Sequence, residues 1–316
     1  MPPPRKFVGV VGRRLMSGGP PLNPYVMDAE PPLTPPEVGV SIMPAHERTA
    51  VRLEGKTAII VGAGQSPGEG MGNGRATVLR FAQEGARIMA VDRDLKSAEE
   101  TAVMVRKQGG ECFAFEADVT KEATLAAAIA AAQKRWGHID ILHYNVGVSI
   151  TGGDAPLLEV TEEAFDRISA INLRGAIMAC KHVIPVMRQQ RSGVIIMISS
   201  LAALEKYPYT VYKATKAAMI AFTKQVAIQN AEYGIRANVI LPGLMNTPMA
   251  IEPRVKISGR RAQVVAERDA RVPLRHKMGT AWDVANAALF LASDEASFIT
   301  GVALPVDGGG AINIGS

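Results

Sequence analysis

From Lys56 onward, short apolar runs rich in β-branched residues alternate with longer stretches of helical periodicity. Most of the short runs are continuously apolar, which is typical of strands that are covered on both faces. The alternation predicts βαβ units, and therefore a doubly wound α/β fold with one seven-stranded parallel sheet and helices on both faces. The predicted strands span residues 58–61, 87–91, 112–115, 139–144, 194–198, 236–241 and 302–306. The predicted helices span residues 75–84, 96–108, 122–136, 161–189, 211–232 and 281–292.

The first 50 residues follow neither pattern, and they contain 11 of the 20 prolines in the chain. Proline at this density interrupts helices and strands alike. We expect residues 1–50 to form a disordered N-terminal extension and residues 51–316 to form one domain.

The composition argues against several classes of protein. The formal charge is +5, but the basic residues are scattered, so we expect no nucleic-acid partner. No apolar run approaches the roughly 20 residues that cross a membrane, so we expect no membrane span. Cys112 and Cys180 lack the spacing of a metal site or a disulfide framework. We therefore expect buried thiols, no metal, and a cytoplasmic protein.

A glycine-rich segment, residues 62–74, follows the first predicted strand and leads into a helix. Glycine allows backbone N–H groups to approach a pyrophosphate, and the partial positive charge of a helix N-terminus stabilises that anion. Gly62, Gly72, Asn73 and Gly74 are the candidates for this contact. A glycine run alone would fit an ordinary turn equally well, so the prediction needs a second signal.

That second signal is Asp92, which ends the second predicted strand 18 residues after Gly74. A carboxylate there accepts hydrogen bonds from a ribose 2′-hydroxyl and repels a 2′-phosphate. The sequence therefore predicts a Rossmann-type fold that binds NAD. NADP is less favoured, but it stays an alternative because Arg75 and Arg93 lie near in sequence and an arginine can accommodate a 2′-phosphate. Asp118 and Val119, after the third strand, fit either an adenine contact or a turn.

Tyr212 and Lys216 lie four residues apart in a predicted helix, so both side chains occupy one face. A free tyrosine has a pKa of about 10, and a cation within about 4 to 6 Å stabilises the phenolate. This pair can therefore remove a proton from an alcohol. Tyr209 and Lys213 have the same spacing and are a rival pair.

Several motifs in this order resemble the classical branch of the short-chain dehydrogenase/reductase family, over about residues 53–309. They are the glycine loop, Asp118-Val119, Tyr144-Asn145-Val146-Gly147, Asn172-Leu173-Arg174-Gly175, Ile198-Ser199-Ser200, Tyr212 to Lys216, Pro242-Gly243 with Thr247, and Asp307-Gly308-Gly309.

The resemblance implies a catalytic tetrad of Asn172, Ser200, Tyr212 and Lys216. Tyr212 would be the acid/base, and Ser200 would hold the substrate oxygen. Lys216 would lower the pKa of Tyr212 and bind the nicotinamide ribose. Asn172 would sit in a helix and hold a water that links Lys216 to solvent. Tyr212 is favoured over Tyr209 because its following residues and its distance from Ser200 match the family.

The resemblance also places Asn145, Gly147, Pro242, Gly243 and Thr247 at the cofactor, with Thr247 against the carboxamide. Two departures stand out. The glycine loop is about six residues longer than the family pattern, and Tyr144 replaces an asparagine. His143, next to Tyr144, is favoured as a packed strand residue over a catalytic base.

The loop after Thr247 would form a lid over the substrate, and it carries Met245, Met249, Ile251 and a basic run at residues 254–261. Methionines favour an adaptable apolar pocket. We therefore expect a small or medium-sized apolar alcohol or ketone as substrate.

The leading hypothesis is an NAD-dependent enzyme that interconverts a secondary alcohol and a ketone. One alternative is an NADPH-linked reductase of 3-oxoacyl groups on a carrier protein, which the basic run favours and Asp92 opposes. Another is a catalytically silent dinucleotide-binding protein, which the presence of both Tyr212 and Lys216 opposes. The family resemblance also implies a homotetramer.

Overall fold

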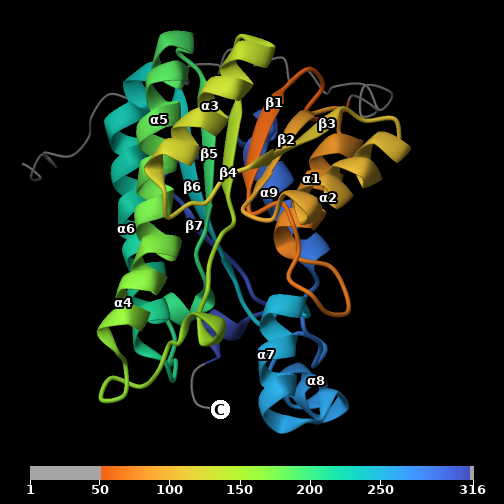
Figure 1. Cartoon of the computed structure of the whole chain (residues 1–316), viewed down its shortest axis with the longest axis vertical. Coiled ribbons are helices and arrows are strands. Elements are labelled where there is room, and N and C mark those ends of the chain that lie inside the picture. The colour runs from red at the N-terminus through yellow and green to blue at the C-terminus, as the bar shows by residue number, and fades with distance from the viewer. Residues whose placement is uncertain (1–50, 314–316) are drawn as a thin grey trace, which may run out of the picture. The chain divides into compact units, whose positions relative to one another are not determined.

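The computed structural model describes residues 51–313, and the prediction for residues 1–50 lies outside them. Seven parallel strands form one sheet in the order β3-β2-β1-β4-β5-β6-β7 (Figure 1). Each predicted strand is present to within two residues at either end. The strands are β1 (Thr57–Val61), β2 (Arg87–Asp92), β3 (Cys112–Glu116), β4 (Ile141–Tyr144), β5 (Gly193–Ile198), β6 (Ile235–Pro242) and β7 (Ala303–Val306).

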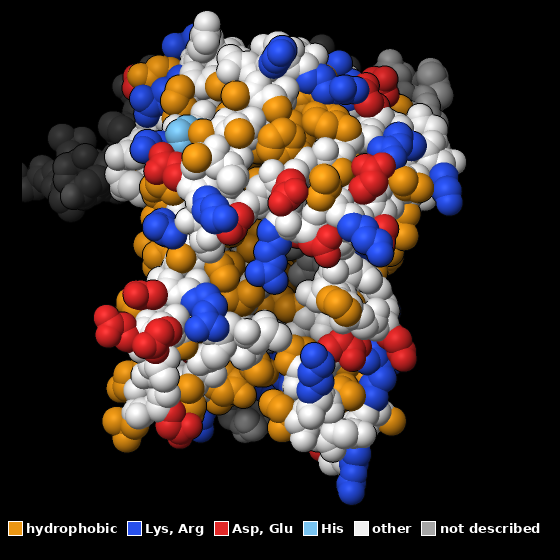
Figure 2. All heavy atoms as spheres, in the orientation of Figure 1, with side chains coloured by type: hydrophobic (Ala, Val, Ile, Leu, Met, Phe, Trp, Pro, Cys, Tyr) orange, Lys and Arg blue, Asp and Glu red, His pale blue; other side chains and the backbone are white. Residues whose placement is uncertain are grey.

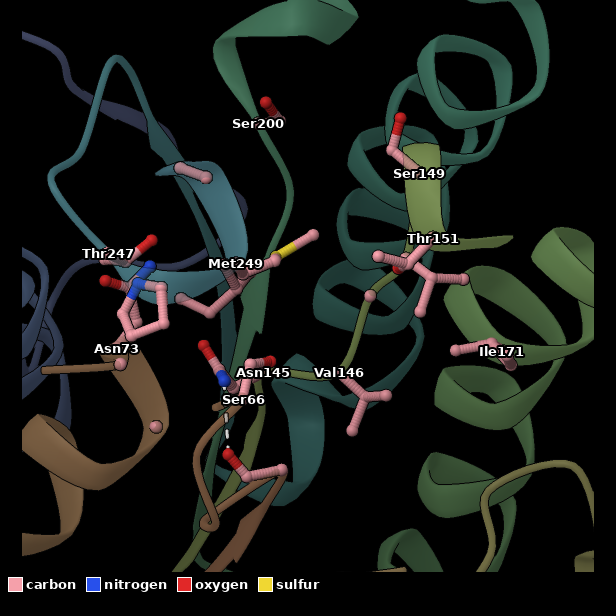
Figure 3. Close-up of a pocket in the computed structure, with 18 of the residues that line it drawn as sticks. Ser66, Asn73, Asn145, Val146, Ser149, Thr151, Ile171, Ser200, Thr247 and Met249 are labelled. Carbon is pink, nitrogen blue, oxygen red and sulfur yellow. Dashed lines mark hydrogen bonds between the residues drawn. The ribbon is translucent and has the colours of Figure 1, made fainter. Parts of the chain in front are cut away.

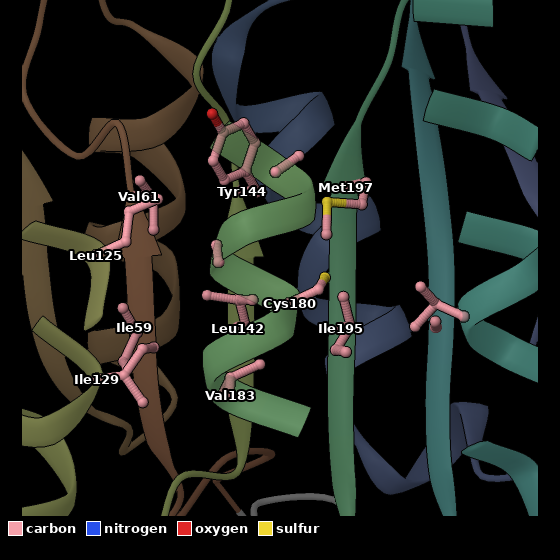
Figure 4. Packing of buried hydrophobic residues seen from close by; sticks show 14 of the residues in the cluster. Ile59, Val61, Leu125, Ile129, Leu142, Tyr144, Cys180, Val183, Ile195 and Met197 are labelled. Carbon is pink, nitrogen blue, oxygen red and sulfur yellow. The ribbon is translucent and has the colours of Figure 1, made fainter. Parts of the chain in front are cut away.

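Helices cover both faces of the sheet, as the doubly wound prediction requires. One hydrophobic cluster joins the sheet to α3, α5 and α6, and Figure 4 shows part of it, where Cys180 and Val183 pack against Leu142 and Ile195. A second cluster joins the opposite face to α1, α2 and α9. The helices in these layers are α1 (Asn73–Gln83), α2 (Leu95–Lys107), α3 (Glu122–Trp136), α5 (Gly175–Gln190), α6 (Thr210–Asn230) and α9 (Ala281–Ala292).

The chain reverses its winding direction between β1 and β4, which are neighbours in the sheet although two strands separate them in sequence. In open α/β sheets, ligands bind at such a switch point, beyond the carboxyl ends of the strands. This topology places the glycine-rich segment after β1 beside the segment after β4.

The predicted helix over residues 161–189 is present and continuous, but it contains a π-helical turn. It consists of α4 (Glu162–Ser169), a π-helical turn (Ala170–Arg174) and α5. The buried Tyr144 of β4 donates a hydrogen bond to the carbonyl of Ile171 at 2.7 Å, which ties the turn to the sheet. The phenol that replaces the family's asparagine thus satisfies a backbone carbonyl within the turn.

The prediction of a lid loop after Thr247 was wrong, because residues 248–270 form two helices, α7 (Pro248–Ser258) and α8 (Arg261–Ala270). Proline is favoured in the first helical turn, and Pro248 occupies that position of α7. Gly259 ends α7 in the left-handed conformation, with φ of 69°. The two helices share a small cluster that includes Ile251 and Val264, and they lie beyond the carboxyl end of the sheet (Figure 1).

Among residues 51–313, no helix is long and apolar enough to cross a membrane.

Candidate active site

A cavity of about 630 Å³ lies beyond the carboxyl ends of the strands. In Figure 3, Ser66 and Asn73 near β1, Asn145 and Val146 after β4, and Met249 of α7 surround it. The structure brings all predicted site residues to this cavity except Asn172. They are Gly62, Gly72, Asn73, Gly74, Asp92, Asp118, Val119, Asn145, Gly147, Ser200, Tyr212, Lys216, Pro242, Gly243 and Thr247.

The glycine segment forms a cradle at the start of α1. Gly62 has a φ of 84°, and a Cβ on Gly74 would lie 1.9 Å from the carbonyl oxygen of Gly62. Gly72 caps α1, and the buried Oδ1 of Asn73 has no hydrogen-bond partner within residues 51–313. A close backbone approach, a helix N-terminus and an unused acceptor together fit a dinucleotide pyrophosphate and its ribose.

The additional residues of this segment form a loop outside the cradle. Gln65 closes it, because its side chain donates to the carbonyl of Gly70 at 3.1 Å and accepts from the amide of Gly72 at 3.0 Å. Glu69 at its tip pairs with Arg261 of α8 at 3.2 Å, and Arg261 also pairs with Glu252 of α7. The loop is thereby joined to the α7–α8 helices, a contact that the sequence pattern did not predict.

Asp92 lies at the end of β2 and faces the cavity. Its carboxylate accepts hydrogen bonds from the amides of Gly64 at 2.9 Å and Asp94 at 3.1 Å. Arg75 points elsewhere, because it is buried and bonded to Thr101 at 2.9 Å and lies outside the cavity lining. Of the two arginines that weighed against NAD, only the exposed Arg93 lines the cavity.

Asp118 has the turn role that was one of its two predicted roles. It accepts hydrogen bonds from the amide of Thr120 at 3.0 Å and the hydroxyl of Thr120 at 2.8 Å. Burial opposes the charged form of Asp118, but these bonds outweigh it and lower the pKa of the carboxyl. Because Asp118 and Val119 also line the cavity, an adenine contact is compatible with the turn.

Tyr212 and Lys216 of α6 are neighbours at the other end of the cavity. The Nζ atom of Lys216 lies 5.7 Å from the centre of the Tyr212 ring and donates to the carbonyl of Ile198 at 2.8 Å. Burial lowers the pKa of Lys216 to about 7 and raises the pKa of Tyr212 to about 12. A hydrogen bond with Ser200 acts in the opposite direction on Tyr212 and favours its ionised form.

The rival pair faces away from this chemistry. Lys213 donates to the backbone carbonyls of Glu205 at 2.6 Å and Ala202 at 3.1 Å, and neither Tyr209 nor Lys213 lines the cavity. Tyr209 instead packs its ring against Tyr207, with the ring centres 5.6 Å apart. Of the two tyrosines, Tyr207 is the one at the cavity.

Asn172 is buried in the π-helical turn, and its amide joins three elements. Its Oδ1 accepts from the amide of Val148 at 2.8 Å, and its Nδ2 donates to the carbonyl of Val148 at 3.0 Å and the hydroxyl of Thr215 at 3.1 Å. These bonds hold the segment after β4 against α6, one residue before Lys216. A water-holding role for Asn172 stays a prediction.

Asp154 is a site residue that the sequence analysis missed. Its two carboxylate oxygens accept hydrogen bonds from the amides of Val211 and Tyr212, both at 2.9 Å. A carboxylate at a helix N-terminus satisfies free N–H groups there and complements the helix dipole. Asp154 therefore anchors the turn of α6 that carries Tyr212. Nothing in the sequence indicates this role, because Asp154 lies 56 positions before the start of α6 and belongs to no recognisable motif.

His143 lies on the opposite face of β4 from Tyr144 and packs near the ring of Phe81. It is completely buried, and neither ring nitrogen has a hydrogen-bond partner within residues 51–313. Burial lowers the pKa of His143 to about 3. The geometry agrees with the packed residue that the sequence analysis favoured.

A scan of family models matches residues 68–310 to a family described as enoyl-(acyl carrier protein) reductase. The chain belongs to the short-chain dehydrogenase/reductase family. Members of this family are oxidoreductases, and membership implies a nicotinamide dinucleotide cofactor and a small-molecule substrate.

Individual relatives agree with this assignment. The chain is 38% identical to 2-(R)-hydroxypropyl-CoM dehydrogenase of Xanthobacter autotrophicus, over 80% of this chain and 97% of the relative. It is 35% identical to 2,5-dichloro-2,5-cyclohexadiene-1,4-diol dehydrogenase of Sphingobium indicum, over 84% of this chain and 100% of the relative. A solved structure of a Burkholderia xenovorans protein assigned to the same family superimposes with a TM-score of 0.78 at 40% identity, covering 84% of this chain and 99% of that one.

Proposed function

We propose that this protein is an NAD-dependent oxidoreductase that interconverts a secondary alcohol and a ketone, with Tyr212 as the acid/base. The observation that carries the proposal is one cavity that holds the glycine cradle and Asp92 at one end and Tyr212, Lys216 and Ser200 at the other. Relatives named as dehydrogenases of hydroxyl-bearing compounds support the reaction class.

The cofactor assignment rests on the charges that face the nucleotide end. Gly62, Gly72 and Gly74 would lie against the pyrophosphate, and Asp92 would bind the adenosine ribose. Asp92 places a negative charge where NADP carries its 2′-phosphate, and Arg75 is turned away from that position. Thr247 and Asn145 would hold the nicotinamide side of the cofactor.

Nicotinamide, when bound, supplies the hydride acceptor or donor. During oxidation, Tyr212 takes the hydroxyl proton while the carbinol carbon loses its hydride, so the substrate loses two electrons and two hydrogens. Ser200 holds the substrate oxygen, and Lys216 stabilises the phenolate of Tyr212 by its charge. During reduction, Tyr212 returns a proton to the ketone oxygen.

The alternative of a carrier-protein reductase keeps one supporting observation. Lys and Arg side chains gather over α7 and α8 (Figure 2), where the phosphopantetheine arm of an acidic carrier could approach. Asp92 argues against the NADPH that this alternative includes.

We further propose a homotetramer, since Phe165 of α4 and Ile228 of α6 are exposed apolar side chains on helices that cover one face of the sheet. A single monomer in light scattering would contradict the tetramer.

The test is reduced-cofactor formation over a panel of secondary alcohols, with NAD and NADP in parallel and with direct measurement of NADH binding. We expect turnover with NAD and a kcat/KM at least about tenfold lower with NADP. Binding of NADH without turnover of any alcohol or ketone would support the silent binder. Preference for NADP would contradict the role of Asp92.

A further inference from the structure

Two arginines of neighbouring helices, Arg254 of α7 and Arg268 of α8, line the same cavity as Tyr212. Arg268 is only 8% exposed, and its Nε donates to the sulfur of Met278 at 3.4 Å, a weak acceptor. Arg254 donates from Nη1 to the carbonyl of Ala250 at 2.6 Å. Within residues 51–313, neither guanidinium has a carboxylate within 4.0 Å, whereas the neighbouring Arg261 contacts two.

Both arginines belong to the end of the cavity where the reaction takes place. Arg254 donates a hydrogen bond to the hydroxyl of Tyr207, and its charge also acts on the hydroxyl of Tyr212. The hydroxyl of Tyr207 in turn acts on Arg268. Tyr207 also shares a hydrogen bond of 3.1 Å with Ser149, which lines the cavity as well. We call the cavity around these five side chains the substrate end.

The acids near the substrate end do not neutralise the two arginines. Asp154 is committed to the N-terminus of α6 through both of its oxygens. Glu205 lines the cavity, but burial raises the pKa of its carboxyl, and the cations that act on it are Arg271 and Lys213. Cationic groups therefore remain in excess at the substrate end.

This excess of charge is costly in the free protein. Burial, together with the charges of Arg254 and Arg271, lowers the pKa of Arg268 to about 10, although a guanidinium ordinarily stays protonated well above that value. A buried charge without a partner destabilises a fold, so such an arrangement is expected where a ligand supplies the missing charge.

We propose that the substrate carries an oxyanion, a carboxylate or a group of similar geometry, that Arg254 and Arg268 bind while Tyr212 acts on its hydroxyl or carbonyl. A planar guanidinium donates two parallel hydrogen bonds to such a group. This inference rests on the proposed function and refines its substrate class. The apolar side chains at the cavity, including Leu201 and Met249, would contact the carbon chain between the two polar ends.

The first arm of the test measures binding without turnover. The NAD-loaded full chain is titrated calorimetrically with straight-chain oxo acids of about four to seven carbons and with their methyl esters, which lack the charge. We expect at least one acid to bind at least about tenfold more tightly than its ester. Equal binding of acid and ester throughout the series would overturn the proposal.

The second arm uses matched variants. Arg268→Met and Arg254→Met keep the apolar length of the side chain and remove the charge. Arg260→Met removes an exposed arginine from the connection between α7 and α8, outside the cavity. We expect either cavity variant to remove the preference for the acid and to leave ester binding within about threefold, and Arg260→Met to keep the preference. Retention of the preference in both cavity variants would overturn the proposal.

Thermal unfolding separates this role from a structural one. Because Arg268 is buried without an acidic partner, Arg268→Met should unfold at the same temperature as the parent or a higher one. A lower unfolding temperature combined with equal loss of acid and ester binding would assign Arg268 to the fold and overturn the proposal. NADH binding in the same samples reports on the proposed function separately, since it can fail while the preference for the acid persists.

Discussion

The two ends of the cavity differ in how their charged groups are satisfied. At the nucleotide end, Asp92 accepts two backbone hydrogen bonds and Arg75 is bonded to side chains of α2. At the substrate end, Arg254 and Arg268 face the cavity without a carboxylate partner among residues 51–313. Both ends lie beyond the carboxyl ends of one sheet, but the two arginines at the substrate end come from α7 and α8.

The difference indicates what each end is built to recognise. The nucleotide end offers backbone N–H groups, a helix N-terminus and the carboxylate of Asp92, which fit a ligand of fixed chemistry. The substrate end offers charge that only a ligand can balance.

The largest expected effect comes from closing the glycine cradle. In Gly74→Ala, the new Cβ would meet the carbonyl oxygen of Gly62 at 1.9 Å, so α1 must shift away from β1. We expect NADH binding to weaken by at least about 100-fold, measured by fluorescence titration. Gly137→Ala at the end of α3 is the control because Gly137 lies outside the cavity and its Cβ would have no neighbour within 4 Å. Equal binding by the two variants would show that close packing at Gly74 does not shape the cofactor site.

The next largest effect is expected on the preference for NAD over NADP when the charge of Asp92 is removed. Asp92→Asn removes the negative charge and keeps an acceptor for the amide of Gly64. We expect the ratio of kcat/KM with NADP to that with NAD to rise at least about tenfold. Glu99→Gln, which removes an exposed acid of α2 outside the cavity, should leave the ratio unchanged. An unchanged ratio in Asp92→Asn would assign the preference to other residues.

His143 is a buried group without a hydrogen-bond partner among residues 51–313, and it lies outside the cavity. Its effect on stability should depend on pH. Its pKa in the folded protein is lowered to about 3, from about 6.5 in the unfolded chain. Only the unfolded chain takes up this proton between those values, so the stability that His143 contributes is complete above pH 6.5 and decreases as the pH falls. Relative to His143→Leu, the protein should lose about 2 kcal/mol of unfolding free energy between pH 7 and pH 5. A difference that does not change with pH, in denaturant titrations, would show that His143 titrates normally.

The smallest effect is expected from the ion pair between Glu69 of the glycine-rich loop and Arg261 of α8. Glu69 is exposed, and its ion pair with Arg261 connects the additional glycine-loop residues to α8. Because exposed ion pairs contribute little, Glu69→Gln should speed NADH release only about two- to fivefold in stopped-flow measurements, and added salt should reduce the difference. Glu267→Gln on α8 is the control. No change in the release rate at low salt would show that the contact between the glycine-rich segment and α8 does not control NADH release.

The sheet was predictable because most of its strands are short, largely apolar runs, which are typical of strands covered on both faces. The glycine cradle and the Tyr212 pair were predictable because their chemistry depends on spacing within one segment. Asp154 and the unpaired Arg268 were not, since each acts across contacts between distant segments. Pro248 and Gly259 did signal the α7–α8 helices, but the mixed polarity between them resembles a loop.

The most direct test of the proposed reaction compares Tyr212→Phe with Tyr209→Phe, because both tyrosines are followed by a lysine four residues later and only Tyr212 lines the cavity. The measurement is kcat for alcohol oxidation with saturating NAD, together with NADH affinity. We expect Tyr212→Phe to lower kcat by at least about 100-fold and to change NADH affinity by less than about threefold, while Tyr209→Phe retains most of the activity. Retained turnover in Tyr212→Phe, or loss of turnover in Tyr209→Phe alone, would contradict the assignment of the acid/base.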